Sequence, residues 1–243
     1  MRALVKKIKG FTIFEVLIVL VLVGIISGIA YPNFSQWRKD RAVKNAAEKI
    51  RGIFLSTNAQ VQRGLYGFAQ VYISPNVDDV DAVDPEILSF SFVSRGMKQK
   101  SIPQRKSDNQ DIWNDSAERC LMESGGQEGD FWDDDGEVSN KPEVGAFTLE
   151  DVSLNITDAA AVCFSKDGSL YGTNGGFIND NAYFGSSVWA IYICDGKNGE
   201  CIIDEDEDED GETESVTYAL SWSRFGNVTL YKYNSGDKEF VVQ

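Results

Sequence analysis

The sequence predicts an α+β protein in which one long N-terminal helix packs on antiparallel β-structure. Three observations lead to this fold class. An apolar stretch, 11–31, contains Glu15 as its only ionisable residue. The chain then continues with apolar residues at helical spacing to about residue 63. After Gly67 it changes to short β-like runs separated by glycine and asparagine turns.

The apolar stretch 11–31 is long enough to be a transmembrane helix. At about 1.5 Å per residue it reaches roughly 31 Å, and the hydrocarbon core of a bilayer is about 30 Å thick. The basic residues before it are Arg2, Lys6, Lys7 and Lys9, with no acid among them. Such a basic flank keeps the N-terminus in the cytoplasm, so we expect everything after Tyr31 to lie outside it.

The helix is expected to continue over 32–63 as an amphipathic segment. Its mostly apolar face consists of residues spaced alternately by four and three: Val43, Ala47, Ile50, Phe54, Thr57 and Val61. This pattern favours packing on a folded domain over binding a cofactor. Gly64 and Gly67 are reasonable stop signals.

The segment 64–243 is expected to be a β-rich globular domain. Candidate strands are 68–74, 88–93, 162–164, 188–194, 216–223 and 227–233. Alternation in Val216–Trp222 predicts a half-buried antiparallel strand. The stretch 75–150 is long, polar and rich in proline, and we interpret it as an insertion displayed on the exposed face. It either contacts a partner or is a decoration without one.

All the cysteines lie in the part that is expected to be exported: Cys120, Cys163, Cys194 and Cys201. An even number of cysteines in an oxidising compartment indicates disulfides. Cys194 and Cys201 are close in sequence and flank a turn-like segment, so this pair is favoured, which leaves Cys120 with Cys163. The alternative is a set of buried free thiols.

The net charge of −15 would become −19 without the leader, which carries four positive charges. Such an acidic domain is a poor match for nucleic-acid phosphates or an anionic membrane surface. The chain has no histidine, the usual general base and the commonest zinc ligand. Since it also lacks phosphate-binding and nucleophile-elbow motifs, we expect no catalysis and no catalytic residue.

Acidic residues cluster at 130–137 and 204–214, where hard cations such as calcium could find several oxygen ligands. In an EF-hand register Asp206, Asp208, Asp210 and Gly211 fit, but the twelfth position is Thr217 where a bidentate Glu is needed. Solvated acidic loops are therefore the default interpretation, and no cofactor or metal is expected.

The N-terminal pattern carries a family resemblance. A basic leader ending in Lys9-Gly10 precedes Phe11, and Glu15 is the fifth residue of the segment that follows. This resembles the signal of type IV prepilins and type II secretion pseudopilins. The alternative is a plain signal-anchor with one stray acid. It is disfavoured because a carboxylate inside a membrane helix costs on the order of 2.5–3.5 kcal/mol.

The resemblance implies cleavage between Gly10 and Phe11 by a prepilin peptidase, which also methylates the new amine of Phe11. It implies that Glu15 serves assembly, by pairing with the amine of a neighbouring subunit. Gly24, Gly28 and Pro32 match a stretch that is melted in pilin filaments, although small residues are also common in membrane helices.

The implied partners are other pilin or pseudopilin subunits and an inner-membrane assembly platform. The implied location is the bacterial inner membrane, with the N-terminus cytoplasmic and the globular domain periplasmic. The subunit would later join a filament in the periplasm or at the cell surface.

Shorter matches resemble the GspH/FimT group of minor pilins and pseudopilins. They are the helix end 61–64 before a strand, Val162–Gly168, and Trp222–Val228. Some FimT-like proteins bind DNA through a C-terminal Gly-Arg-x-Arg turn. This chain has Gly226–Thr229 there, without either arginine, so DNA capture is disfavoured despite Arg224 and Lys232.

Three functional hypotheses follow. The first is a structural minor subunit of a pilus or secretion pseudopilus, near the filament tip. The second is an adhesin or uptake receptor carried on a pilus, acting through 75–150. The third is a membrane-anchored exported domain that never polymerises. The sequence leaves open whether the machine is a pilus or a secretion system.

Overall fold

The computed structural model describes residues 12–77, 87–108, 110–121, 145–150, 152–156, 158–173, 178–179, 189–196, 201, 217–223, 225–234 and 236–243. Within these ranges it gives only the backbone at 26, 28–33, 35–36, 77, 87–88, 105, 112, 116–117, 121, 169–173 and 178–179. The chain divides into two compact units, Met1–Asp40 and Arg41–Gln243. Helix α1 (Ile13–Gln62) contributes to both.

The long helix predicted over 11–63 is confirmed as α1, and its C-terminal end is fixed by glycine. The amide of Leu65 donates to the carbonyl of Gln60 at 3.1 Å, and that of Gly64 donates to the carbonyl of Val61 at 2.9 Å. Gly64 has φ 77°, which favours a residue without a Cβ. These paired bonds form a Schellman cap, so Gly64 is the stop that its position in the sequence indicates.

No helical stretch among the described residues combines the length and the apolar character needed to cross a membrane. The expected transmembrane segment 11–31 is only partly described. Phe11 lies outside the described residues, and several later positions have no described side chain. Its membrane-spanning role therefore stays a prediction.

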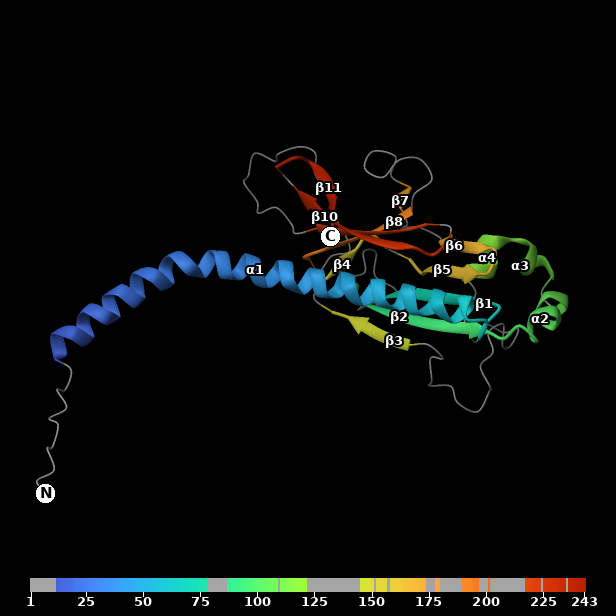
Figure 1. Ribbon diagram of the computed structural model, residues 1–243, viewed down its shortest axis with the longest axis horizontal. Coiled ribbons are helices and arrows are strands. Elements are labelled where there is room, and N and C mark those ends of the chain that lie inside the picture. The colour runs from blue at the N-terminus through green and yellow to red at the C-terminus, as the bar shows by residue number, and fades with distance from the viewer. Residues whose placement is uncertain are drawn as a thin grey trace, which may run out of the picture. The chain divides into compact units, whose positions relative to one another are not determined.

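The described strands form two antiparallel sheets (Figure 1). The first sheet has the order β3-β2-β1-β5-β6, with β1 (Phe68–Val77), β2 (Ile87–Met97), β3 (Gly145–Leu149), β5 (Ala160–Ser165) and β6 (Gly168–Thr173). The second sheet has the order β11-β10-β9-β8-β4, and β7 also pairs with β8. Its strands are β4 (Ser153–Leu154), β7 (Ile178–Asn179), β8 (Trp189–Cys194), β9 (Thr217–Trp222), β10 (Val228–Asn234) and β11 (Glu239–Val242).

Each run that the sequence marks as a strand overlaps an observed one, namely β1, β2, β5, β8, β9 or β10. The strands β3, β4, β6, β7 and β11 were not predicted. Neither were the helices α2 (Ile102–Asp108), α3 (Gln110–Asn114) and α4 (Ser116–Leu121). The α+β class, a long helix on antiparallel sheets, is confirmed and is pilin-like.

The main core lies between the two sheets and the part of α1 that begins at Arg41. Every residue of the predicted apolar helix face is fully buried: Val43, Ala47, Ile50, Phe54, Thr57 and Val61. Phe54 contacts both sheets, with ring centroids 6.3 Å from Phe164 of β5 and 5.5 Å from Trp222 of β9. Burying an aromatic ring of this size removes a large apolar area from water, so Phe54 helps to hold the sheets together.

One polar pair is included in this core. The hydroxyl of Thr57 lies 2.7 Å from that of Ser94 on β2, and Thr57 also donates to the carbonyl of Ile53 at 2.7 Å. Both side chains are fully buried, so their hydrogen bonds avoid the cost of unsatisfied hydroxyls. Thr57 therefore attaches α1 to the first sheet, although it occupies a position of the otherwise apolar helix face.

Residues 68–73 of β1 and 160–164 of β5 are buried on both faces of the first sheet, because helices α2, α3 and α4 cover this part of its second face. Successive residues of β5 alternate between two cores, with Val162 and Phe164 facing the main core. Ala161 and Cys163 join a second core with Phe68, Tyr72, Met97 and Cys120. Ile102 and Trp113, from α2 and α3, pack against that second core.

The interval 75–150 is more regular than its polar, proline-rich composition suggests. It contains the core strand β2, whose Phe90 and Phe92 are buried, the edge strand β3, and the helices α2–α4. Of these elements only β2 was predicted, because helices of five to seven residues are too short to show a helical spacing. Whether any part is an insertion relative to similar proteins stays a prediction.

The expected half-buried strand at 216–222 also needs correction, since every residue of β9 is buried. Tyr218, Leu220 and Trp222 face the main core. Ala219, on the opposite face, joins Ala190 and Tyr192, with Phe240 of β11 packed against them. Alternation of apolar and small polar residues does not distinguish a solvated face from one covered by a neighbouring hairpin.

Candidate processing and assembly site

The first described residues form the N-terminal cap of α1. The amide of Glu15 donates to Thr12 Oγ1 at 3.3 Å and to the carbonyl of Thr12 at 3.1 Å. Threonine followed three residues later by glutamate is the capping-box signature. This signal is visible in Thr12-Ile13-Phe14-Glu15, and it gives Glu15 a place in the helix cap that the prediction of assembly alone did not include.

Glu15 itself is exposed in the first turn, where the helix dipole favours a negative charge. Gly10 and Phe11, the residues on either side of the expected cut, lie outside the described residues. Glu15 therefore lies in the first turn of the described helix, and its function in assembly stays a prediction.

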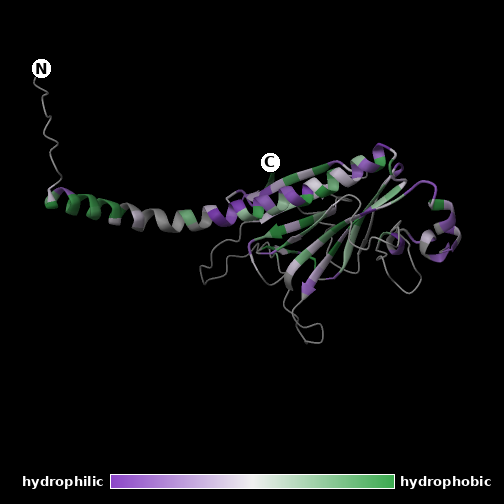
Figure 2. Cartoon of the chain, turned by 90° about the horizontal axis from the view of Figure 1, so that it is seen from below, coloured by the Kyte–Doolittle hydropathy of each residue, from purple (hydrophilic) through white to green (hydrophobic). Residues whose placement is uncertain are grey.

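The start of α1 is apolar on all sides. Ile13 is 83% exposed and Ile25 is 56% exposed, and the large apolar residues described between them are exposed as well. Figure 2 shows this beginning of the helix in hydrophobic colours and the later helix with hydrophilic residues interspersed. A helix that is hydrophobic all round requires an apolar surrounding of lipid or other helices. This surface fits insertion in a membrane and contact with other subunits.

The backbone stays helical through Gly24, Gly28 and Pro32. A Cβ at Gly24 would meet nothing within 4 Å, so no close contact within the chain requires glycine there. Proline has no amide proton, so Pro32 cannot make the helical bond to the carbonyl of Gly28, four residues earlier. The expected capacity of this stretch to unwind stays a prediction, and the lost bond is its physical basis.

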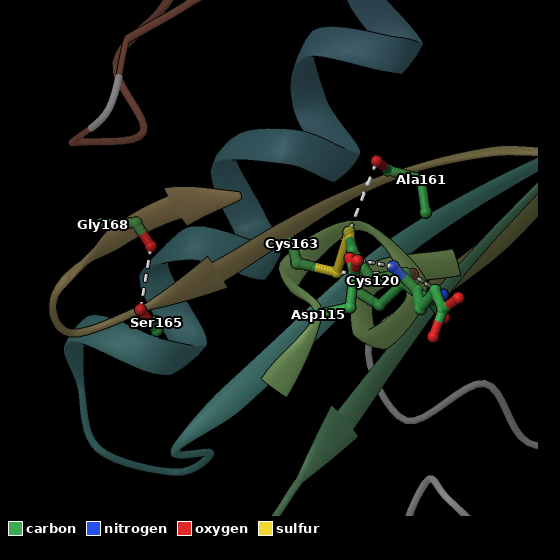
Figure 3. The surroundings of a disulfide bond; sticks show 8 residues. Asp115, Cys120, Ala161, Cys163, Ser165 and Gly168 are labelled. Carbon is green, nitrogen blue, oxygen red and sulfur yellow. Dashed lines mark hydrogen bonds between the residues drawn. A yellow bond between two sulfur atoms is a disulfide. The ribbon is translucent and has the colours of Figure 1, made fainter. Parts of the chain in front are cut away.

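Two disulfides join the pairs that the sequence favours. Cys120 of α4 is bonded to Cys163 of β5, with Cα atoms 5.7 Å apart (Figure 3). Cys194, at the end of β8, is bonded to Cys201, with Cα atoms 5.6 Å apart. The first bond attaches the helical segment to the first sheet, and the second closes a short loop. Both are consistent with an extracytoplasmic domain.

The helical segment is also held by a buried amide and a stacked guanidinium. Gln70 Nε2, on β1, donates to the carbonyl of Cys120 at 2.6 Å. Arg119 Cζ lies 5.3 Å from the ring centroid of Phe68 and 5.1 Å from that of Trp113. Burial lowers the pKa of the Arg119 guanidinium, and the negative charge of Asp115 partly offsets this effect. Helices α2–α4, which we call the helical cap, are thus attached through bonds, stacking and a disulfide.

The turn between β9 and β10 contains Gly226, where the sequence lacks the arginines expected of a DNA-binding turn. Gly226 has φ 77°, and its amide donates to the carbonyl of Ser223 at 2.9 Å. Asn58 Nδ2, on α1, donates to the carbonyls of Phe225 and Gly226, each at 3.4 Å. The turn is thus attached to the helix, and it exposes Phe225, which is 76% accessible. Arg224 lies outside the described residues.

The acidic clusters at 130–137 and 204–214 lie outside the described residues. Thr217, where the EF-hand register lacks its glutamate, is described. Thr217 is buried in β9. In the part of the chain that the structure describes, no three carboxylate, cysteine or histidine groups gather in a way that would hold a metal ion.

One family model matches the chain. It is described as the prokaryotic N-terminal methylation motif and covers residues 5–31. The match is confined to the N-terminal part of the chain. No curated protein matches, and no solved structure does.

The matched motif is typical of type IV pilins and pseudopilins, and it includes Gly10, Phe11, Glu15 and Gly24. It implies a structural protein made as a prepilin that is anchored in the inner membrane, with an extracytoplasmic domain. It also implies processing by a prepilin peptidase and assembly with pilin-type partners in general. The match ends at residue 31, so the globular unit of the chain is outside it.

Proposed function

We propose that this chain is a minor pilin or pseudopilin subunit of a type IV pilus or a type II secretion pseudopilus. A prepilin peptidase cleaves it between Gly10 and Phe11 and methylates the amine of Phe11. The segment 11–31 holds it in the inner membrane until it enters a filament, at or near the tip. The observation that carries this proposal is the methylation motif over 5–31, continuing as one helix into a folded domain.

The finer assignment to the GspH/FimT group rests on short segments that have defined roles in the fold. The segment 61–64 forms the helix cap, Val162–Gly168 forms β5 and its turn into β6, and Trp222–Val228 forms the β9–β10 turn. These short matches support our proposal of this group. The family model that matches the N-terminus does not extend to the globular unit.

Processing is tested by producing the full chain with and without a prepilin peptidase and determining the N-terminus by mass spectrometry. We expect a product that begins at Phe11 and carries one added methyl group. Gly10→Val should leave the leader attached, because a β-branched side chain replaces the glycine at the cut. Lys9→Gln is the matched control beside the cut and should be processed. Cleavage at another site, or no cleavage of the wild type, would refute the proposal.

A pilus-borne binding module is a second candidate function, and the helical cap favours it. The cap presents exposed residues such as Gln104 and Asp111 on a surface that is tied to the sheet by a disulfide. A rigid, covalently attached surface suits recognition of a partner at low entropic cost. Replacing Gln104, Lys106 and Asp111 with alanine should reduce adhesion or uptake while filament incorporation is retained. Unchanged adhesion and uptake would count against the receptor function.

A further inference from the structure

An aromatic pair and two basic residues lie together just after the apolar start of α1. The rings of Phe34 and Trp37 are stacked, with centroids 5.6 Å apart. Phe34 is 56% exposed and Trp37 is 50% exposed. Arg38 and Lys39 follow immediately, and both are exposed. We call these four residues the aromatic-basic collar.

The distance from the expected N-terminus places the collar at a definite depth. From Phe11, Phe34 is about 34 Å and Trp37 about 39 Å along the helix at roughly 1.5 Å per residue. A helix tilted by about 20° reduces these depths by only a few per cent. The hydrocarbon core is about 30 Å thick and the whole bilayer about 40–45 Å thick. When Phe11 lies at the cytoplasmic edge of the core, the second headgroup layer spans about 30–37 Å from it, so Phe34 falls within this layer and Trp37 lies at its outer boundary.

We propose that the aromatic-basic collar binds the headgroup layer of anionic phospholipids on the outer side of the inner membrane. The proposal rests on the proposed function, in which 11–31 spans that membrane. Tryptophan and other aromatic rings prefer this layer, where an apolar ring meets the polar boundary. Arginine forms bidentate hydrogen bonds with phosphate oxygens, and lysine adds a point charge.

The net charge of −15 does not oppose this contact. At physiological ionic strength charges are screened beyond about 8 Å, so the lipid phosphates respond to the local cations and not to the whole domain. The collar carries two positive side chains before Asp40. Each basic residue near an anionic surface contributes about 1 kcal/mol, or roughly a fivefold local enrichment.

Before assembly, the subunit would be attached to the membrane by both the apolar helix and the collar. The collar would also set the depth of the helix, and therefore the depth of Glu15 at its other end. A neighbouring subunit's helix is the competing occupant of the exposed rings, and the experiment below distinguishes it.

The test uses the full chain reconstituted in phosphatidylcholine vesicles and in vesicles of equal parts phosphatidylcholine and phosphatidylglycerol. Some lipids carry bromine, which quenches tryptophan, either near the glycerol or near the chain ends. Subtracting the emission of Trp37→Phe from that of the wild type isolates Trp37. We expect stronger quenching by the shallow bromine than by the deep one. We also expect a several-fold preference for brominated phosphatidylglycerol over brominated phosphatidylcholine.

The double variant Arg38→Gln/Lys39→Gln should lose the preference for phosphatidylglycerol and keep the shallow quenching. Lys100→Gln/Lys166→Gln removes the same total charge from exposed positions of the globular unit and should keep the preference. Asp40→Asn should keep or raise it. Equal quenching by both lipids in the wild type, or the same preference in the double variant, would overturn the proposal.

Two further outcomes are separated by controls. Extraction of the chain from the vesicles by alkaline carbonate would refute the membrane span, and with it the proposed function. A chain that resists extraction while Trp37 is quenched by neither lipid would overturn the collar proposal alone. If Trp37 is then protected only at high protein-to-lipid ratio, a second copy of the chain occupies the rings.

Discussion

The amide of Glu15 donates to Thr12 Oγ1 at 3.3 Å, so the acidic residue of the methylation motif also belongs to the first turn of a capped helix. Capping and assembly make different demands on the side chain. A cap needs an acceptor at position 12 and tolerates glutamine at position 15. An ion pair with the amine of a neighbouring subunit needs the negative charge.

These demands predict different results for Glu15→Gln and Thr12→Ala. Breaking a buried ion pair costs about 3–5 kcal/mol, so Glu15→Gln and Glu15→Ala should both reduce filament incorporation to less than about a tenth of wild type. Thr12→Ala removes only the cap, worth about 0.5–2 kcal/mol, and should be incorporated nearly normally. Incorporation is measured by immunoblotting of sheared filaments against the membrane pool.

Processing at Gly10 and membrane insertion should be unchanged in all three variants, which serves as the control. If Glu15→Gln assembles as well as the wild type while Thr12→Ala does not, the cap is the requirement and the ion-pair interpretation fails. If all three assemble normally, neither the charge of Glu15 nor the cap is required for assembly, and the assembly function of Glu15 is refuted.

The disulfides are expected to contribute unequally to the stability of the globular unit. In the chain-entropy model, a bond stabilises more when it closes a longer loop. Cys120–Cys163 spans 43 residues, which corresponds to about 4 kcal/mol, whereas Cys194–Cys201 spans 7, which corresponds to about 2 kcal/mol. Replacing each pair with serine should lower the free energy of unfolding in that order, as measured by urea denaturation of a version beginning near residue 33. The reverse order would show that loop closure does not determine the difference.

Much of the fold could be predicted because it depends on periodic patterns. The buried face of α1 follows the helical spacing from Val43 to Val61, and the stop at Gly64 follows from its positive φ. The helical cap could not be predicted in the same way. Its helices have only five to seven residues, too short for a spacing to emerge, and their core is completed by Phe68 and Cys163 from distant strands.

The residues of the candidate site also differ in whether a local sequence pattern can predict them. Gly10, Phe11 and Glu15 lie close together in the sequence, so a short pattern is sufficient to find the methylation motif. The cap at Thr12 was equally local and was missed because one function had already been assigned to Glu15. The contact of Asn58 with Gly226 joins residues 168 positions apart, and no pattern within a single sequence indicates such a pair.

Gln70 provides a test of how the helical cap is attached. Its Nε2 donates to the carbonyl of Cys120 at 2.6 Å, and both residues are buried. Gln70→Met keeps a similar shape but leaves that carbonyl without this donor, at an expected cost of about 1–3 kcal/mol. The cap should then be cut faster by trypsin between residues 102 and 121, as followed by mass spectrometry.

Gln104→Met is the matched control, since Gln104 is exposed on α2 and should tolerate the change. Faster cleavage in both variants would indicate a general effect of methionine and not the loss of the Gln70 hydrogen bond. Unchanged cleavage in Gln70→Met would mean that the disulfide and the stacking of Arg119 are sufficient to hold the cap.

The final prediction concerns the attachment of the β9–β10 turn to α1. A Cβ at Gly226 would overlap the side chain amide of Asn58, and φ 77° disfavours any residue with a Cβ. The backbone strain amounts to about 1–2 kcal/mol and the overlap to about 1–3 kcal/mol. Gly226→Ala should therefore lower the free energy of unfolding by both amounts. In an Asn58→Ala background only the strain remains.

A double-mutant cycle by urea denaturation should thus give a coupling of about 1–3 kcal/mol between the two positions. Asn58→Ala alone should cost less than about 1 kcal/mol, because its bonds to the turn are long, at 3.4 Å each. Asn45→Ala, at an exposed position on the same helix, is the control and should show no coupling to Gly226→Ala. Additive effects of Asn58→Ala and Gly226→Ala would mean that the turn moves away from the helix to accommodate alanine, and that Asn58 does not determine its position.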